Sequence, residues 1–223
     1  MIKRQNVKVI KIREETPDVK SFIMERPADF EYEAGQYVIL FIGEYERAFS
    51  LASSPTENFL FITAKMIDSP FKGKMSGLLG READISGPFG RFVLEKVKSH
   101  VMVAAGIGIA PFRSMIKCAT DRGLDDNITL IYSNKTEQDI AFLDEFDQLQ
   151  LKNKNLRVVH TLTRSENSKY RTGRVDDAMI REIADLNSVF YVCGPPTMVD
   201  GVVAMLKNMG IKEIRFEKFT GYK

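Results

Sequence analysis

Apolar and polar residues alternate along the first part of the chain with the period of two that half-buried β-strands show. β-branched and aromatic residues fill the alternating stretches, and glycines and prolines separate them. The stretches predicted to be strands are 6–12, 19–24, 35–42, 47–53 and 59–67, with a short helix at 75–80. Several short strands at close spacing predict a small antiparallel β-barrel.

The pattern changes near residue 99. Residues 100–105 form a continuous apolar run, which is typical of a strand buried on both faces. Helical and strand patterns then alternate, with helices at 110–121, 141–150, 175–185 and 196–209 and strands at 127–133, 156–162, 189–193 and 211–217. This alternation predicts a doubly wound parallel sheet. We therefore expect two domains, an antiparallel β-barrel over residues 1–97 and an α/β domain over residues 98–223.

Composition excludes several classes of protein. The 223 residues carry a formal net charge of +2, which argues against a general nucleic-acid binder. No apolar run approaches the ~18 residues of a membrane span. The N-terminal segment alternates instead of forming the apolar core of a signal peptide, so we expect a cytoplasmic protein. Cys118, Cys193, His100 and His160 show no metal-ligand spacing, and neither a metal site nor an iron–sulfur cluster is predicted in this chain.

A glycine turn follows the first strand of the α/β half, in the sequence AAGIGIAP at 104–111. Gly106 and Gly108 leave the backbone open to a ligand, and the helix start beyond them offers free N–H groups and a positive dipole end. Pro111 suits a first helical turn, where its missing N–H costs nothing. The arrangement predicts an anion site that fits a pyrophosphate, although a plain tight turn has the same pattern.

The sequence CGPP at 193–196 ends a later parallel strand. Ligands of such sheets bind beyond the carboxyl ends of the strands, so this turn and the glycine turn should flank one crevice. Gly194 and Pro195 would form a rigid turn with a bare face, over which a flat ring could lie with Cys193 beside it. The alternative is a small buried cysteine at the end of a strand.

Two stretches of the barrel half also carry unusual combinations of residues. The sequence RAFSLASSP at 47–55 places Arg47 and Phe49 within three residues of Ser50 and ends in further hydroxyls. A solvent loop does not need an arginine and an aromatic so close together, and a core strand does not favour so many hydroxyls. Further on, Gly73 and Ser76 lie near the predicted helix and suggest a second phosphate cradle.

Together these stretches resemble the ferredoxin–NADP(+) reductase superfamily over essentially the whole chain. The family's Arg-x-aromatic-Ser-x-x-Ser-x-Pro flavin motif is matched at 47–55, and its Gly-x-x-Ser phosphate loop is matched at 73–76. Its Gly-x-Gly-x-x-Pro and Cys-Gly-Pro-Pro motifs are matched at 106–111 and 193–196. The resemblance implies a flavin-binding barrel followed by an α/β domain that binds a nicotinamide nucleotide.

The resemblance also implies a role for each motif residue. Arg47 would bind the flavin phosphate oxygens through its planar guanidinium, and Phe49, where the family usually has tyrosine, would lie on the isoalloxazine. Ser50 would reach flavin N5 and Cys193 would pack near nicotinamide C4, which makes these two the implied catalytic residues. The implied flavin-binding residues are Arg47, Phe49, Ser50, Leu51, Gly73, Lys74, Met75 and Ser76, with Phe219 or Tyr222 covering the flavin face. The implied nucleotide-binding residues are Gly106, Gly108, Pro111, Arg164, Lys169, Tyr170, Cys193, Gly194 and Pro195.

The implied cofactors are a flavin and a nicotinamide nucleotide. FAD is preferred, with FMN as the lesser alternative because the phosphate motif alone does not require an adenylate. Cations and an aromatic ring follow the strand at 156–162, a combination that suits the 2′-phosphate of NADPH; they are Arg164, Lys169, Tyr170 and Arg171. Glu166 is the nearest acidic residue that could instead bind a ribose hydroxyl, as in NADH. NADPH is favoured, although ordinary solvated loop cations would give the same pattern.

The implied reaction is hydride transfer between nicotinamide C4 and flavin N5, followed by transfer of electrons to or from an acidic carrier such as ferredoxin or flavodoxin. Charge counts support an acidic carrier, because residues 65–98 include seven basic and four acidic side chains, whereas residues 25–57 include seven acidic and two basic ones. The other interpretation is that these lysines are ordinary solvated charges or serve only the flavin phosphates. The alternatives are an electron-relay subunit of a larger assembly and a reductase of a small-molecule acceptor. A relay subunit with its own [2Fe–2S] cluster is not expected, because the C-terminal cysteine group is missing.

Overall fold

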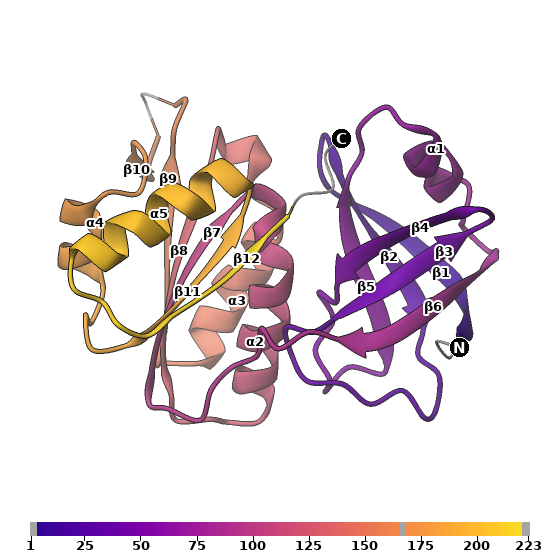
Figure 1. Cartoon of the computed structure of the whole chain (residues 1–223), viewed down its shortest axis with the longest axis horizontal. Coiled ribbons are helices and arrows are strands. Elements are labelled where there is room, and N and C mark those ends of the chain that lie inside the picture. Colours follow the sequence, from indigo (N-terminus) through magenta and orange to yellow (C-terminus); the bar gives the residue numbers. More distant parts are fainter. Residues whose placement is uncertain (1–3, 166–167, 220–223) are drawn as a thin grey trace.

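Two sheets stand side by side in the computed structural model, which describes residues 4–165 and 168–219 (Figure 1). The first sheet has the strand order β4-β3-β6-β1-β2-β5, and every neighbouring pair is antiparallel. A bridge between Leu51 and Ile62 joins the end of β4 to β5, so the two edge strands meet and the sheet curls into a barrel. Its strands are β1 (Gln5–Thr16), β2 (Val19–Glu25), β3 (Tyr37–Ile42), β4 (Tyr45–Ser50), β5 (Phe59–Lys65) and β6 (Glu82–Phe89).

The apolar positions of the alternating pattern fill the barrel interior. They include Val7, Val9, Phe22, Met24, Val38, Leu40, Leu60, Ile62 and Ile85. The predicted antiparallel barrel is confirmed. Strand β6 was not predicted, because its sequence EADISGPF includes a glycine and a proline, residues that usually mark turns.

Helix α1 (Pro70–Ser76) packs its apolar face against the barrel. Its start is fixed by Ser69, whose hydroxyl accepts a hydrogen bond from the Lys72 N–H at 3.3 Å, and by a proline in the first turn. The helix predicted at 75–80 starts too late, because this serine–proline pair begins the helix earlier and Gly77 ends it.

The second sheet has the strand order β10-β9-β8-β7-β11-β12, and every neighbouring pair is parallel. Its strands are β7 (Ser99–Ala105), β8 (Asn127–Asn134), β9 (Leu156–Leu162), β10 (Arg171–Thr172), β11 (Val189–Gly194) and β12 (Ile214–Lys218). Helices α2 (Ile109–Asp121) and α3 (Leu143–Lys152) cover the face toward the barrel, and α4 (Asp177–Ile183) and α5 (Pro196–Asn208) cover the other face (Figure 1). The predicted doubly wound sheet is confirmed. Strand β10 was not predicted, because it is two exposed residues long and shows no apolar pattern.

A shared apolar cluster joins the two halves. Ala52, Phe61 and Phe92 of the barrel half lie in the same buried cluster as the barrel-facing residues of α2 and α3. The ring centroids of Phe61 and Phe142 are 6.0 Å apart, and those of Phe92 and Phe112 are 5.7 Å apart. The barrel and the α/β half are therefore packed on each other through buried side chains.

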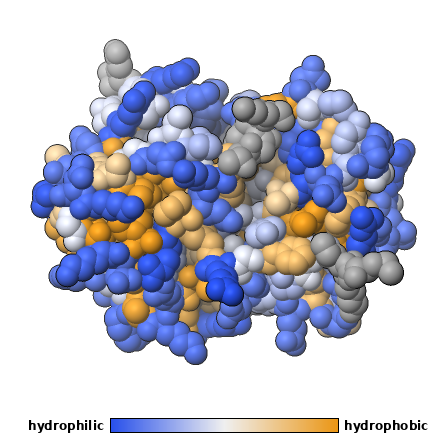
Figure 2. All heavy atoms as spheres, viewed as in Figure 1, coloured by the Kyte–Doolittle hydropathy of each residue, from blue (hydrophilic) through white to orange (hydrophobic). Residues whose placement is uncertain are grey.

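Charged and polar residues cover most of the face shown in Figure 2, and the apolar residues visible there gather mainly in the α/β half, near α5 and β12. Phe216 of β12 is 50% exposed. None of the helices in the described residues has the length and the apolar content needed to cross a membrane.

The turns at the carboxyl ends of β7 and β11 pack directly against each other. A short 3-10 turn, Gly106–Gly108, follows β7, and Gly194 ends β11. A Cβ atom at Gly108 would lie 2.3 Å from the Cys193 carbonyl oxygen and 2.7 Å from Gly194 Cα. No side chain fits in that space, so glycine at 108 lets the two strand ends meet.

Replacing Gly108 by alanine should therefore lower the free energy of unfolding by about 1–3 kcal/mol, the range for forcing a methyl group into a packed interior. The control is Gly201→Ala inside α5, where a Cβ atom would meet nothing within 4 Å and alanine favours the helix by up to ~1 kcal/mol. Urea unfolding followed by circular dichroism compares the two variants with the wild type. A Gly108→Ala protein as stable as the wild type would contradict this close packing.

Candidate functional site

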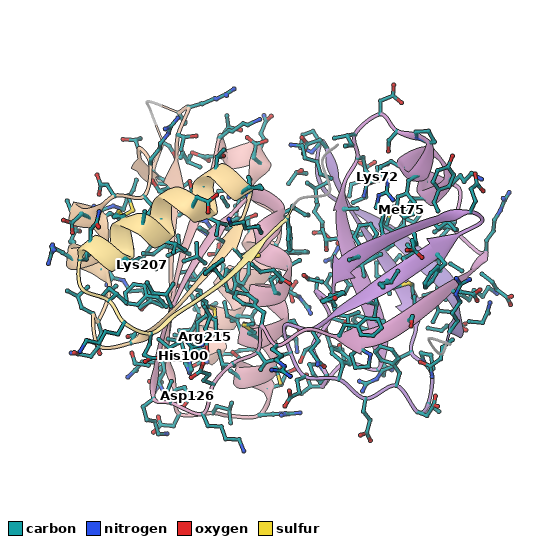
Figure 3. The ribbon with its side chains drawn as sticks, viewed as in Figure 1. Lys72, Met75, His100, Asp126, Lys207 and Arg215 are labelled. Carbon is teal, nitrogen blue, oxygen red and sulfur yellow. The ribbon has the colours of Figure 1, made fainter. Side chains whose placement is uncertain are left out.

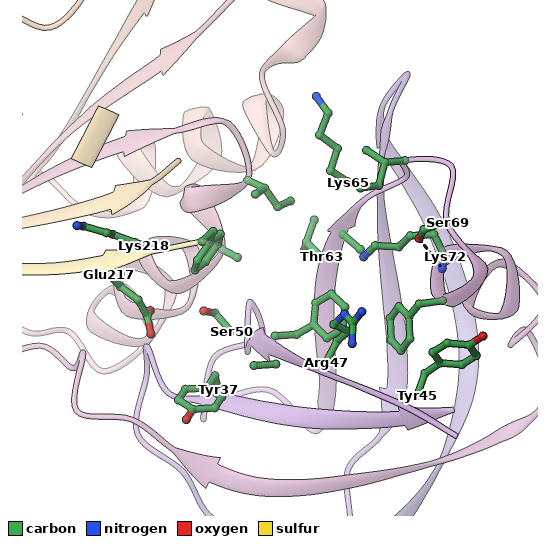
Figure 4. Close-up of a pocket in the computed structure, with 18 of the residues that line it drawn as sticks. Tyr37, Tyr45, Arg47, Ser50, Thr63, Lys65, Ser69, Lys72, Glu217 and Lys218 are labelled. Carbon is green, nitrogen blue, oxygen red and sulfur yellow. Dashed lines mark hydrogen bonds between the residues drawn. The ribbon is translucent and has the colours of Figure 1, made fainter. Parts of the chain in front are cut away.

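A cavity of about 590 Å³ lies at the junction of the two halves (Figure 4). Its walls come from β4 and β5, the start of α1, the turn after β7 and the end of β12. Of the residues predicted to bind a flavin, Arg47, Phe49, Ser50 and Phe219 line this cavity. All four residues of the RAFS sequence at 47–50, which end strand β4, therefore border one space.

Two cations stand at one end of the cavity. Arg47 from β4 and Lys72 from α1 both line it and approach each other there (Figure 4). The Lys72 amine lies 4.6 Å from the ring centroid of Phe49 and 3.9 Å from the sulfur of Met75, the other α1 residue labelled in Figure 3. Burial, with a smaller contribution from Arg47, lowers the pKa of Lys72 to about 8. Among the described residues no carboxylate forms an ion pair with either cation, so this end of the cavity fits a phosphate or pyrophosphate.

The residues predicted to form the phosphate loop lie inside α1 instead of around the cavity. The Gly73 N–H donates to the Ser69 carbonyl at 2.9 Å, and the Ser76 hydroxyl donates to the Lys72 carbonyl at 3.0 Å. Met75 is buried in the barrel core, and the Lys74 amine bonds the Glu44 carboxylate at 3.1 Å. The residues here that line the cavity are one turn earlier: they are Ser69, which caps α1, and Pro70, Phe71 and Lys72 of its first turn.

A half-buried carboxylate lies at the opposite end of the cavity. Glu217 of β12 and Ser50 of β4 both line it there, and their side-chain oxygens point into it (Figure 4). One carboxylate oxygen of Glu217 is buried without a hydrogen-bond partner among the described residues, and burial raises the pKa of this group. Sequence reasoning missed Glu217, although its position at the end of the last parallel strand, two residues before Phe219, is a usable signal.

Aromatic rings form the flat walls of the same cavity. Phe49 stacks on Phe71, with ring centroids 6.0 Å apart and an interplanar angle of 21°. Phe219 is half-buried, and its N–H donates to the Gly194 carbonyl at 3.0 Å, which ties the chain after β12 to the end of β11. Leu51, also predicted at the flavin site, is fully buried in the barrel core, and Tyr222 lies outside the described residues.

A second cavity of about 350 Å³ adjoins the first and lies at the carboxyl ends of the parallel strands. Gly106 and Pro195 line it from the two turns, and Asp18 lines it from the barrel. Ile107 and Lys65 line both cavities, so the two spaces meet at these residues.

Two features of the second cavity fit a nucleotide. Gly106 has φ of +51°, a conformation that glycine adopts without strain, and its carbonyl accepts a hydrogen bond from the Tyr132 hydroxyl at 3.0 Å. Asn134, at the end of β8, is buried in the cavity wall, and neither atom of its amide has a hydrogen-bond partner among the described residues. Buried amides are normally paired, so this one indicates a ligand with polar groups. Sequence reasoning missed Asn134.

Other residues predicted to bind the nucleotide lie behind the cavities. Cys193 is fully buried and lines neither of them, and burial together with the nearby Glu217 raises the pKa of its thiol. Gly108 and Gly194 pack on each other as described above, and Pro111 is buried in the first turn of α2.

The residues proposed for a 2′-phosphate lie at the surface beyond β9. Arg164 and Lys169 are exposed, and the Lys169 amine is 4.9 Å from the ring centroid of Tyr170. Arg171 is already engaged, because both of its terminal nitrogens bond the Glu182 carboxylate at 2.7 and 2.6 Å. Glu166 lies outside the described residues.

Known proteins with similar sequences place the chain in a family. Residues 102–204 match the family model of the oxidoreductase NAD-binding domain. The chain is 31% identical over 231 residues to the reductase component of propane 2-monooxygenase from Gordonia sp. (strain TY-5), covering 96% of this chain and 67% of that protein. The chain belongs to the ferredoxin–NADP(+) reductase superfamily. Another relative, the gamma subunit of sulfhydrogenase 2 from Pyrococcus furiosus, is 30% identical, with 92% of this chain and 79% of that protein covered.

The fold comparison agrees with the superfamily assignment. A ferredoxin NADP+ reductase from Neisseria gonorrhoeae, solved with bound FAD and NADP, superposes with a TM-score of 0.84 at 24% identity, covering 98% of this chain and 99% of that one. The chain spans 49% to 66% of the lengths of four other reductase and electron-transfer proteins that it matches. The predicted superfamily, the two-part fold and the cofactor class of a flavin with a nicotinamide nucleotide are confirmed.

Proposed function

We propose that this protein transfers a hydride between NAD(P)H and FAD and passes the electrons on to a protein carrier. The observation that supports this most directly is the pair of cavities that meet at Ile107 and Lys65. One has a cationic end that suits a flavin phosphate. The other has a buried amide, without a hydrogen-bond partner in the part of the chain that the structure describes, that suits a nucleotide. The purified protein should be yellow, and acid extraction should release FAD. A colourless protein that gains no flavin absorbance when FAD is added would contradict the proposal.

The bound flavin would supply N5 as the hydride acceptor, and the protein would align the two rings and exclude water. Ser50 can donate or accept a hydrogen bond, so it can serve both redox states of a ring at its end of the cavity. Glu217, with its raised pKa, can hold a proton beside the same ring edge. Phe49 and Phe219 would enclose the ring system. Arg47 and Lys72 favour FAD, because two cations that have no carboxylate partner among the described residues match a pyrophosphate.

The carrier is proposed to be an acidic protein such as a ferredoxin or flavodoxin, or the oxygenase component of a larger system. The relative from Gordonia is named as a reductase component of a monooxygenase, which supports delivery of electrons to a partner protein. The sulfhydrogenase gamma subunit supports the second candidate, a relay subunit that works within an assembly. Steady turnover of the purified protein with NAD(P)H and a dye would favour the free-standing enzyme over the relay.

Lys72, not Lys74, should hold the flavin phosphates. Lys72→Met should weaken FAD binding by about 1.5–3 kcal/mol, the value for a hydrogen bond to a charged group. Lys74→Met on the same helix should leave binding nearly unchanged, because Lys74 faces Glu44 and does not line the cavity. Fluorescence titration of the flavin-free protein with FAD measures both variants. Equal losses in the two variants would contradict this assignment.

The same lysine predicts how flavin affinity varies with pH. Only protonated Lys72 attracts the phosphates, and in the flavin-free protein its pKa is about 8. A bound anion raises this pKa, so affinity should be full below pH 8 and should fall as the pH rises from 8 toward the pKa of the complex. Lys72→Met should lose this dependence, whereas a wild-type affinity that stays constant from pH 7 to pH 10 would count against the role.

We propose that the protein prefers NADPH to NADH and that Arg164 binds the 2′-phosphate of NADPH. Arg164→Gln should lower kcat/KM for NADPH about tenfold, or ~1.4 kcal/mol, and leave kcat/KM for NADH almost unchanged. Arg171→Gln is the matched control, because Arg171 is held by Glu182. Steady-state kinetics with both nucleotides decides the question. A wild-type preference for NADH, or an equal effect of both substitutions, would reject the NADPH assignment.

The electrostatic part of the carrier proposal can be tested by releasing a paired lysine. Glu44→Gln frees Lys74 near the cavity. Glu182→Gln in α4 frees Arg171 of β10, away from the larger cavity, with the same change in net charge. At low ionic strength Glu44→Gln should speed reduction of an acidic ferredoxin about two- to threefold, and the gain should vanish near ~0.5 M salt. Glu182→Gln should have no such effect, and neither variant should alter reduction of a neutral quinone. Identical behaviour of the two variants toward ferredoxin would argue against an acidic carrier docking here.

A further inference from the structure

Helix α2 links the two cavities to the barrel. It follows directly on the 106–108 turn, whose Ile107 lines both cavities, and its second residue, Ala110, lines the larger one. Arg113 comes three residues later, about 4.5 Å along the helix axis, and its side chain is only 4% exposed. The α2 residue that binds the barrel is therefore within one turn of residues that line the cavities.

The guanidinium of Arg113 bonds groups from both halves. One terminal nitrogen donates to the Ala52 carbonyl at 3.0 Å and to the Glu57 carboxylate, and the other donates to the same carboxylate at 2.9 Å and to Glu145. Its carbon lies 4.7 Å from the ring centroid of Phe61. Ala52, Glu57 and Phe61 belong to the barrel half, whereas Glu145 belongs to α3. Arg113 thus forms a bidentate ion pair with Glu57 across the junction and a second ion pair with Glu145 within its own half.

The barrel segment that Arg113 holds is the continuation of the strand with Ser50. Ala52 is two residues after Ser50, which lines the larger cavity. The Ser114 hydroxyl donates to the Ser53 carbonyl at 2.5 Å, so the next residue of α2 holds the next residue of this segment. The hydroxyl-rich end of RAFSLASSP is therefore fixed to α2, while its beginning lines the cavity.

A buried ion pair of this kind is an inefficient source of stability. Removing the charges from water offsets most of their attraction, and apolar residues of similar volume often do as well. A bidentate guanidinium–carboxylate pair differs from apolar packing in that it allows only a narrow range of distances and planes. We propose that Arg113, paired with Glu57, is a positioning residue that sets the separation and tilt of the two cavities. This inference rests on the proposed hydride transfer between them.

The expected consequence is a defect in chemistry without a defect in binding. Hydride transfer moves a hydrogen nucleus and two electrons from nicotinamide C4 to flavin N5, and the reacting atoms must approach to ~3–3.5 Å. A misplacement of about 1 Å can slow such a step on the order of a hundredfold. Neither Arg113 nor Glu57 lines a cavity, so neither is placed to contact a cofactor directly.

The test compares two isosteric substitutions on the same guanidinium. Glu57→Gln weakens the ion pair across the junction, and Glu145→Gln weakens the one within the α/β half. In stopped-flow experiments at saturating nucleotide, Glu57→Gln should slow flavin reduction on the order of ten- to a hundredfold and weaken the nicotinamide–flavin charge-transfer band. Its dissociation constants for FAD and for the nucleotide should stay within about twofold of the wild type, the effect of a substitution outside the binding contacts. Arg113→Lys keeps the positive charge but cannot bind a carboxylate through two parallel hydrogen bonds, so it should slow flavin reduction as well.

Glu145→Gln should stay close to the wild type in every one of these measurements. A readout without cofactors is amide hydrogen exchange of residues 50–57 in the flavin-free protein, which should be faster in both Glu57→Gln and Arg113→Lys than in Glu145→Gln. Arg113→Lys is needed because the Glu57 carboxylate also accepts the Ser54 N–H within this segment, a bond that Arg113→Lys leaves in place. Equal rates of flavin reduction in the two variants, or a rate loss matched by an equal loss of affinity, would overturn the inference. If the wild type itself binds no flavin or is reduced by neither nucleotide, the proposed function fails, and the exchange experiment alone still decides whether Glu57 anchors this segment.

Discussion

The packing of α2 against the barrel governs both cavities at once. At its start, α2 follows the turn that lines the nucleotide cavity and the larger cavity together, and one turn later Arg113 and Ser114 bind the backbone that continues from Ser50. The Phe92–Phe112 contact adds apolar packing beside these bonds. A shift of α2 would move the floor of one cavity relative to the wall of the other. Because the proposed hydride transfer is sensitive to distance, this one helix–barrel contact would limit its rate however well the rest of the site binds the cofactors.

The larger cavity is electrically polarised along its length. Lys72 at one end has a lowered pKa and Glu217 at the other has a raised pKa, and burial is the first cause of both shifts. Each group is thus pushed toward its neutral form while no ligand is near it. A flavin, with phosphates at one end and a ring that exchanges protons at the other, would bring the partner that each group needs. In the proposed function, the same charge distribution would favour this cofactor and set its orientation.

Sequence alone predicted what depends on local pattern. The alternation at 59–67 predicted strand β5, and the glycine–proline turns at 106–111 and 193–196 predicted where strands end and a crevice opens. The sequence could not show that Lys72, and not Lys74, lines the larger cavity. Both are lysines in one short helix, and the residue at which the helix begins decides which of the two side chains points into the cavity. Arg113 was equally hidden, because its barrel partner Glu57 is 56 residues away in sequence. Such roles arise from tertiary contacts, which periodicity does not encode.

Charge counts along the chain were a poor guide to the surface for the same reason. The stretch 65–98 is rich in lysine and arginine, yet Lys65 bonds Asp18 at 2.6 Å and Lys74 bonds Glu44 at 3.1 Å. Lys72 faces the cavity, where flavin phosphates would neutralise it. The cations nearest the cavity are therefore largely compensated, and a carrier approaching this side meets a much weaker positive field than the sequence suggests. Long-range attraction of the proposed acidic carrier would then be modest, and short-range fit to the assembled surface would contribute more to its binding than the charge counts suggest.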